Sequence, residues 1–308
     1  MFTRARNGQA MAARSKLGIV TAAALAALTA GCRKGDGLAD QGQVGAAVGE
    51  VMASADESAQ SGSTTAMLPA APVLRLPAEL RAPAWRRAMG ALAPLSSAHA
   101  ASCLPVTYST CSAGVRTATF DTCSVGAVTV DGSIDLTFSD AAACNIATVG
   151  DSVNRTGSLT LSAPAGSLAI TAPGGGQTLT RTATGFSFAV PGMERVLTLA
   201  SGRTLFDIST MTSSPLVITG SSRADMAIVG GTLVITHNLA GYAVALTPEN
   251  LTWTATCNCA SSGSLTGTVT SGKDAGKSAS VTITGCGTAD VTIDGDTESV
   301  TLDRCSTI

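Results

Sequence analysis

The feature that most constrains the fold is a regular alternation of threonine or other polar residues with branched apolar residues. It recurs along the chain, for example at residues 134–138, 159–161 and 281–283. Successive side chains of a strand point to opposite faces, so this period of two indicates antiparallel strands with one dry face. Further runs of this kind are residues 128–130, 168–170, 232–236 and 251–253.

We therefore predict an all-β domain over residues 101–308, built as an extended antiparallel β-meander. About fifteen short strands joined by hairpins would form a long sheet, a sandwich or an open barrel-like structure. The abundance of threonine and valine agrees with this prediction, because β-branched residues favour strands. Glycine- and proline-rich stretches at residues 173–176, 229–231 and 247–250 are expected to be turns.

The two ends of this domain resemble each other. Residues 119–132 match residues 282–295, and each copy contains an Asp-Gly pair and runs on through another strand to a cysteine, Cys144 or Cys305. Asp-Gly between alternating runs is a strong signal for a tight hairpin turn. We expect two related hairpins, braced by cysteines.

The N-terminal region resembles a lipoprotein export signal. Arg4, Arg6, Arg14 and Lys16 precede a short apolar stretch that ends in the lipobox-like residues 28–32, with Cys32 last. The stretch is shorter than the roughly 20 residues that a membrane-spanning helix needs. We predict a signal peptide at residues 1–31, which starts at Met1 or Met11, and acylation of Cys32. An ordinary cleaved signal beside a coincidental cysteine is the alternative.

Residues 32–100 are expected to form the lipidated N-terminus and a tether that is partly helical and partly disordered, with helices that fold back on the main domain as an open alternative. The apolar residues Leu38, Val44, Val48, Val51 and Met52 indicate a short helix, which the Ser/Thr/Gly run at residues 61–65 ends. The Ala/Pro-rich residues 70–94 include Trp85 beside arginines. This cluster is read as a solvated helix face, with contact to lipid headgroups as the alternative.

The cysteine count supports export. Nine cysteines are present, and acylation of Cys32 leaves an even number, which outside the cytoplasm indicates disulfides. Plausible bridges are Cys123–Cys144 and Cys286–Cys305, whereas Cys111–Cys123 is disfavoured because one strand-like run separates the two residues. Cys257 and Cys259 are expected to take partners elsewhere, and a Cys₄ zinc site is the alternative. The candidate disulfide residues are Cys103, Cys111, Cys123, Cys144, Cys257, Cys259, Cys286 and Cys305.

Motifs for catalysis are weak. The formal net charge is −2, and removal of residues 1–31, which hold four cations and no anions, makes it −6, so we expect no nucleic-acid partner. Only His99 and His237 are present, which excludes histidine-based triads and zinc-hydrolase motifs. Residues 271–278 end like a phosphate-binding loop but join two strands, so a polar hairpin is predicted. Carboxylates around Asp294 and Asp296 leave calcium binding open as an alternative.

With the lipobox, the Cys257-x-Cys259 pair, residues 263–267 and the Gly285-Cys286-Gly287 turn, the chain resembles a group of uncharacterised bacterial lipoproteins with Thr/Gly-rich β-meander domains. The resemblance implies a lipoprotein that is held by its lipid anchor on the periplasmic or surface side. Arg33 follows Cys32 where an inner-membrane retention signal usually carries Asp, which by analogy with lipoprotein sorting favours the outer membrane. We expect no enzymatic activity and no cofactor, and a structural or binding role with an envelope protein or lipid partner. A carrier of lipid or another apolar ligand and an exported hydrolase are the alternatives.

Overall fold

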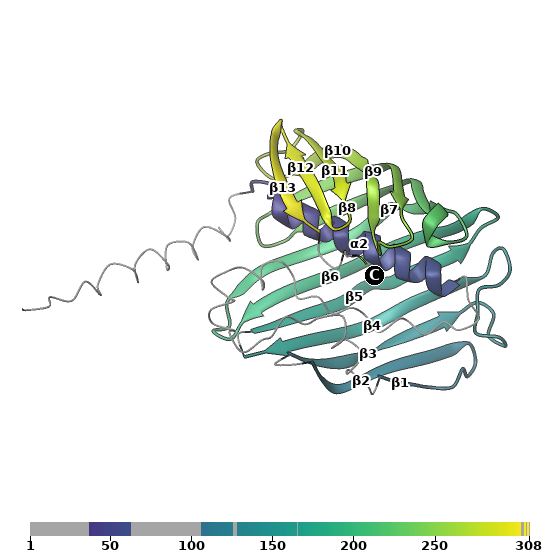
Figure 1. Ribbon diagram of the computed structural model, residues 1–308. Coiled ribbons are helices and arrows are strands. Elements are labelled where there is room, and N and C mark those ends of the chain that lie inside the picture. Colours follow the sequence, from purple (N-terminus) through teal and green to yellow (C-terminus); the bar gives the residue numbers. More distant parts are fainter. Residues whose placement is uncertain are drawn as a thin grey trace, which may run out of the picture. The chain divides into compact units, whose positions relative to one another are not determined.

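The computed structural model describes residues 37–62, 106–125, 128–164, 166–302, 305 and 307. The predicted signal peptide, Met11, Cys32, the Trp85 cluster, His99 and Cys103 lie outside this part of the chain. Within it, one helix, α2 (Gln41–Gly62), precedes a single 13-stranded antiparallel sheet whose strands follow sequence order from β1 to β13 (Figure 1). The predicted all-β meander is confirmed, and the sheet is open.

The alternating runs named above all fall inside strands, and most of their apolar members whose side chains are described face the core. In β6 (Gly185–Leu199), for example, buried and half-buried positions alternate over most of the strand. The remaining strands are β1 (Val106–Tyr108), β2 (Val115–Val125), β3 (Val128–Phe138), β4 (Ser152–Ala163), β5 (Gly166–Arg181), β7 (Thr204–Thr219), β8 (Ala227–His237), β9 (Tyr242–Trp253), β10 (Ala260–Ser271), β11 (Ser278–Gly285), β12 (Thr288–Ile293) and β13 (Asp296–Thr301); a short 3-10 helix, η1 (Arg223–Asp225), joins β7 to β8.

Three of the predicted turns are wrong, because residues 173–176, 229–231 and 247–250 lie within β5, β8 and β9. Shifts in register interrupt the pairing of neighbouring strands near these stretches. They occur between each pair of neighbours from β4 to β8 and between β9 and β10. At Gly176 a Cβ atom would overlap the carbonyl oxygen of Arg155 on β4, so only glycine fits there. Glycine and proline therefore mark a row of bulges, which bend long strands without ending them.

The two repeats also differ in structure. Asp294 and Gly295 form the predicted turn between β12 and β13, and both have positive φ. The equivalent Asp131 and Gly132 lie inside β3, where Gly132 pairs with Leu159, so the prediction of a hairpin turn at this pair is wrong. The resemblance in sequence reflects shared strand patterning more than a shared hairpin.

Helix α2 is part of the core of the sheet domain. Asp40 precedes it, and the Asp40 carboxylate accepts a hydrogen bond of 2.9 Å from the Gln43 amide, as an N-cap residue does. The helix contacts β5, β6 and β7 in the middle of the sheet and β12 and β13 near its end. The sheet thus curls so that two separate groups of strands lie against one helix (Figure 1).

The helix predicted around Val44–Met52 is confirmed, and it packs on the sheet domain, which is the fold-back arrangement that the sequence left open. Residues 37–62 belong to the same compact unit as the sheet. Nearly every described side chain of the helix is buried, including Val44, Val48, Ala53 and Ala55. A helix buried on all sides needs apolar or small residues on all sides, which the alanine- and glycine-rich sequence supplies.

The meander gives the sheet two rims. Because consecutive strands run in opposite directions, successive turns lie alternately at one rim and at the other. We call proximal the rim near the start of α2; it includes the turns at residues 200–203, 238–241, 272–277 and 294–295. The distal rim includes the connections at residues 109–114, 139–151, 220–226, 254–259 and 286–287. In the part of the chain that the structure describes, no helix is long and apolar enough to span a bilayer.

Candidate functional site: the surface that docks the helix

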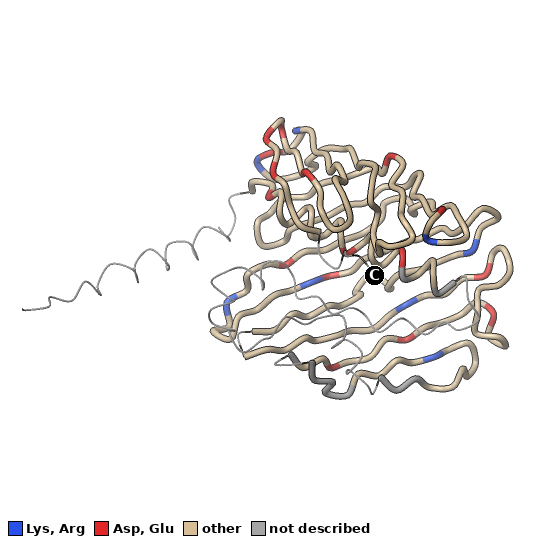
Figure 2. The backbone as a smooth tube through the Cα atoms, viewed as in Figure 1, with Lys and Arg blue, Asp and Glu red and all other residues tan. Residues whose placement is uncertain are grey.

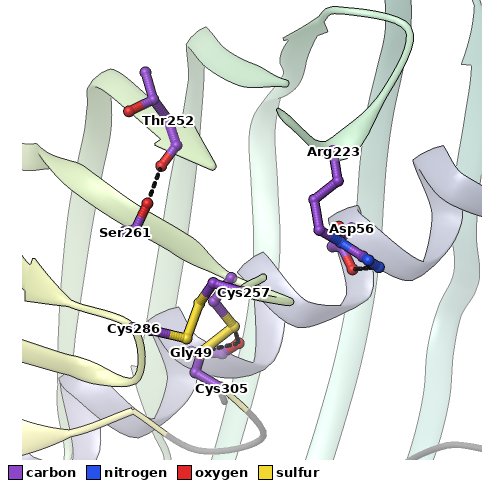
Figure 3. Close-up of a disulfide and its surroundings, with 9 residues drawn as sticks. Gly49, Asp56, Arg223, Thr252, Cys257, Ser261, Cys286 and Cys305 are labelled. Carbon is purple, nitrogen blue, oxygen red and sulfur yellow. Dashed lines mark hydrogen bonds and ion pairs between the residues drawn. A yellow bond between two sulfur atoms is a disulfide. The ribbon is translucent and has the colours of Figure 1, made fainter. Parts of the chain in front are cut away.

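Two acidic side chains of α2 are buried against the sheet, and each meets an arginine. Asp56, whose side chain is 1% exposed, accepts two hydrogen bonds of 2.8 Å from Nε and Nη2 of Arg223 in η1 (Figure 3). Glu50 lies 4.0 Å from Arg195 on β6, and both side chains are about equally buried. The hydrogen bonds that Arg223 donates to Asp56 raise the pKa of Arg223, so the guanidinium stays charged. The bidentate pair fixes the position of the helix against η1.

Arg195 is held by more than this ion pair. Its guanidinium lies 5.9 Å from the centre of the Phe206 ring on β7, a distance at which a cation is attracted by the face of an aromatic ring. The arginine thus sits on the concave face of the sheet between a carboxylate and a ring. Glu50 and Asp56 are thus each paired with an arginine, and these two pairs position α2 against the sheet domain.

Three disulfides brace the distal rim. They join Cys111 to Cys144, Cys257 to Cys286, and Cys259 to Cys305. The carbonyl oxygen of Gly49 on α2 lies 3.7 Å from the Cys305 sulfur and 3.9 Å from that of Cys259 (Figure 3). The Cys259–Cys305 bridge therefore packs directly on the middle of the helix.

The prediction that disulfides form is confirmed, but both predicted pairings, Cys123–Cys144 and Cys286–Cys305, are wrong. Cys144 belongs to a connection at the distal rim, whereas Cys123 pairs in register with Val130 close to the opposite end of β2. Cys144 instead bonds to Cys111, which shares its rim. Cys286 and Cys305 both lie at the distal rim, but each bonds to a member of the Cys257-x-Cys259 pair. The prediction that Cys257 and Cys259 take partners elsewhere is confirmed; Cys103 and the side chain of Cys123 lie outside the described residues.

The segment before the helix is fixed at the proximal rim. The Gly37 amide donates to the carbonyl of Ala240, and the Lys273 amide donates to the carbonyl of Gly37 at 2.7 Å. The Ala39 amide donates to the buried carboxylate of Asp274 at 2.9 Å. These bonds, which we call the clamp, hold residues 37–39 between the β8–β9 and β10–β11 turns. Gly37 is buried with φ near +69°, and a Cβ there would crowd Lys273.

The phosphate-loop-like stretch is a hairpin, as predicted. Residues 272–277 join β10 to β11, and Lys277 Nζ lies 2.9 Å from Asp274 and 3.1 Å from Asp294. The bond from Ala39, followed by that from Lys277, lowers the pKa of Asp274. Asp290 accepts a hydrogen bond from Ser299. Among the described residues, no group of three or more histidine, cysteine, aspartate or glutamate side chains is arranged to hold a metal ion.

His237 and Tyr242 flank the clamp and are both almost fully buried. The Ala240 amide donates to Nδ1 of His237 at 3.1 Å, so the neutral imidazole carries its proton on Nε2. Burial lowers the pKa of His237, although the charges of Asp40 and Asp207 oppose that shift. Burial also raises the pKa of Tyr242. His237 thus supports the turn whose Ala240 carbonyl holds Gly37.

Sequence reasoning missed the charged residues that dock the helix. One signal was available: Arg195 occupies an inward position in the alternation of Met193, Arg195 and Leu197. Glu50 and Asp56 carry no such signal, because α2 is small and apolar all round and has no single wet face. No family model, curated protein or solved structure matches this chain.

Proposed function

We propose that this chain is a lipid-anchored lipoprotein of the outer membrane with a non-enzymatic, structural or binding role in the cell envelope. The observation that carries the proposal is the lipobox ending at Cys32, five residues before Gly37, the first described residue of the folded domain. Three disulfides further along the chain suit an oxidising compartment. A rigid, cross-braced sheet suits a protein that works by presenting a surface.

The filled concave face weighs against the carrier of apolar ligands. Such a carrier needs an open apolar cavity, commonly of several hundred cubic ångströms. Here α2 occupies the concave side of β5–β7 and β12–β13, and its residues join one continuous apolar core with the strands. A ligand would have to displace a helix that is held by buried ion pairs.

The placement of the carboxylates weighs against a hydrolase. General acid–base work needs convergent carboxyl groups that are open to a substrate. The three buried acids of the described chain, Glu50, Asp56 and Asp274, each face a basic side chain. Acids in such pairs hold elements of the fold together, so a binding or structural role is the better fit.

The experiment is metabolic labelling of cells with an alkyne fatty acid, followed by mass spectrometry of the mature N-terminus. We expect the label on Cys32, cleavage before it, and recovery of the protein in the outer-membrane fraction. The matched controls are Cys32→Ala, which should abolish the label, and Cys103→Ala, which should retain it. An unlabelled mature chain that begins at another residue would overturn the proposal.

A further inference from the structure

We propose that the proximal rim faces the lipid headgroups of the membrane and that the disulfide-braced distal rim points away from it. This inference rests on the proposed acylation of Cys32 and adds an orientation to it. Its partner is the headgroup surface of a phospholipid bilayer. The argument uses the position of the clamp, the length of chain before it, and the chemistry of the rim.

The clamp fixes where the chain enters the fold. Gly37 is bonded to Ala240 and Lys273, which belong to two different hairpin turns of the proximal rim. Gly272 packs against the same residue so closely that a Cβ on it would overlap the Gly37 carbonyl oxygen and crowd Tyr242. Backbone bonds on both sides of Gly37 leave this point little freedom to move relative to the sheet.

The chain between the lipid and the clamp is short. Gly37 is five residues beyond Cys32, and a fully extended chain advances at most about 3.6 Å per residue, so the clamp lies within about 18 Å of the acylated residue. The 12 residues of β9 separate the two rims, and at about 3.3 Å per residue they span about 40 Å. A domain that stood upright on its distal rim would hold the clamp about 40 Å from the lipid, which this short connection cannot reach.

The proximal rim is polar and carries both signs of charge. Arg203 and Lys273 are exposed there, as are Asp294, Asp296 and Glu298 of the last hairpin. Figure 2 shows basic residues (blue) and acidic residues (red) close together at the tips of the last hairpins. Such a rim suits contact with phosphate and ammonium groups of lipid headgroups and does not suit insertion into hydrocarbon. The expected arrangement is a domain that stands on its proximal rim.

A domain that lies on its side is the competing arrangement. The outer face of the sheet would then meet the lipid, and Met211 on β7, which is 42% exposed, marks that face. The two arrangements differ in which positions touch lipid. Ala275 in the β10–β11 turn marks the proximal rim, and Ala224 in η1 marks the distal rim; both are exposed.

The test places the photo-crosslinker p-benzoylphenylalanine at one of these positions in the acylated full chain. Ala275, Ala224 and Met211 are each replaced in turn, and the proteins are reconstituted into vesicles of phosphatidylethanolamine and phosphatidylglycerol. After irradiation, lipid adducts are counted by mass spectrometry. We expect at least severalfold more adducts at position 275 than at 224 or 211. Equal or greater labelling at either of those positions would overturn the orientation.

Two further measurements separate this proposal from the one on which it rests. Flotation of the protein with the vesicles reports anchoring alone, so a chain that fails to float contradicts acylation before orientation is measured. A flexible Gly/Ser insert of about twenty residues between Cys32 and Gly37 adds about 25 Å of mean reach. We expect this insert to reduce the preference for position 275 while flotation is retained. A preference that stays unchanged would overturn the argument from the short connection.

Discussion

At the scale of single residues, the two partners of the Asp56–Arg223 ion pair are unequal. The side chain of Asp56 is 1% exposed and that of Arg223 is 23% exposed. Loss of the arginine leaves a buried carboxylate without its bidentate cation, which costs about 3 kcal/mol. Loss of the acid leaves a guanidinium that reaches water, at a cost of about 1.5 kcal/mol. We expect Arg223→Ala to lower the free energy of unfolding more than Asp56→Ala, as measured by urea denaturation with the disulfides intact.

The matched control for this pair is Arg203→Ala, which removes an exposed arginine from a turn of the proximal rim. A surface change of that kind alters stability by about 0.5 kcal/mol or less. The double variant of Asp56 and Arg223 should lose less than the sum of the two single losses. Equal losses in the single variants, or simple additivity in the double variant, would contradict this account of the pair.

Part of the docking surface could be predicted at the residue scale, and part could not. Arg195 stands at an inward position of an alternating strand, so its burial follows from the pattern alone. A buried arginine in turn requires an acidic partner. The identity of that partner does not follow, because Glu50 lies on a helix far away in sequence. No local rule connects the two elements.

At the scale of elements, glycine lets α2 approach the last strands closely. A Cβ on Gly45 would lie 2.6 Å from Cγ2 of Val300 on β13 and 3.4 Å from Cγ2 of Val291 on β12. A larger side chain must therefore push helix and strands apart, and overpacking of this kind costs about 1–3 kcal/mol. We expect Gly45→Leu to lower the free energy of unfolding by that amount, measured by thermal or urea unfolding.

The same helix provides the control for this substitution. The nearest atom to a Cβ on Gly42 is Asp40 Oδ1 at 3.3 Å, so Gly42→Leu should be near neutral, since leucine favours the helix more than glycine. Val300→Ala should restore part of the stability lost in Gly45→Leu by making room for the new side chain. If Gly42→Leu lowers stability as much as Gly45→Leu, or if Val300→Ala gives no rescue, the close contact between Gly45 and Val300 is not the cause of the loss.

Strand identity was predictable at this scale, and strand length was not. Alternation alone places residues 281–283 and 251–253 in strands, because only a half-buried sheet needs that period. Glycine and proline at residues 173–176 and 229–231 carry the same signal whether they end a strand or bend it. Here they form bulges within long strands, and the deciding interaction lies between neighbouring strands, as between Gly176 and Arg155.

At the scale of the whole molecule, curling makes the N-terminal helix a core element. The sheet is long enough that its middle strands and its last strands both reach α2. Neither the curl nor the pairing of Cys259 with Cys305 follows from sequence, since both depend on where distant strands meet. The bridges gather at the distal rim, whereas hydrogen bonds of the clamp hold the proximal rim. The two rims therefore differ in what limits their opening.

The stability of the whole molecule should depend on pH through His237, which supports a turn of the proximal rim. An unfolded histidine has a pKa of about 6.5, and burial lowers that of His237 in the folded chain. Between the two values the unfolded state binds more protons, so the free energy of unfolding rises with pH, by at most about 1.4 kcal/mol per pH unit for one group. Protonation also removes the Nδ1 acceptor of the Ala240 amide and so weakens the turn that holds Gly37.

We expect urea denaturation at a series of pH values between 7.5 and 5 (chosen to cross the ordinary histidine pKa of about 6.5) to show falling stability toward the acid side. His237→Asn keeps an acceptor near the position of Nδ1 but cannot take up a proton in this range, so its stability should vary less with pH. His99, the other histidine of the chain, supplies the matched control, His99→Asn. If the free energy of unfolding still varies with pH in His237→Asn but no longer does so in His99→Asn, the pH dependence arises from His99 and this mechanism is contradicted. The protection factor of the Ala39 amide, which corrects for the slower intrinsic exchange at low pH, should fall with the same pH profile, because the clamp opens when the imidazole becomes charged.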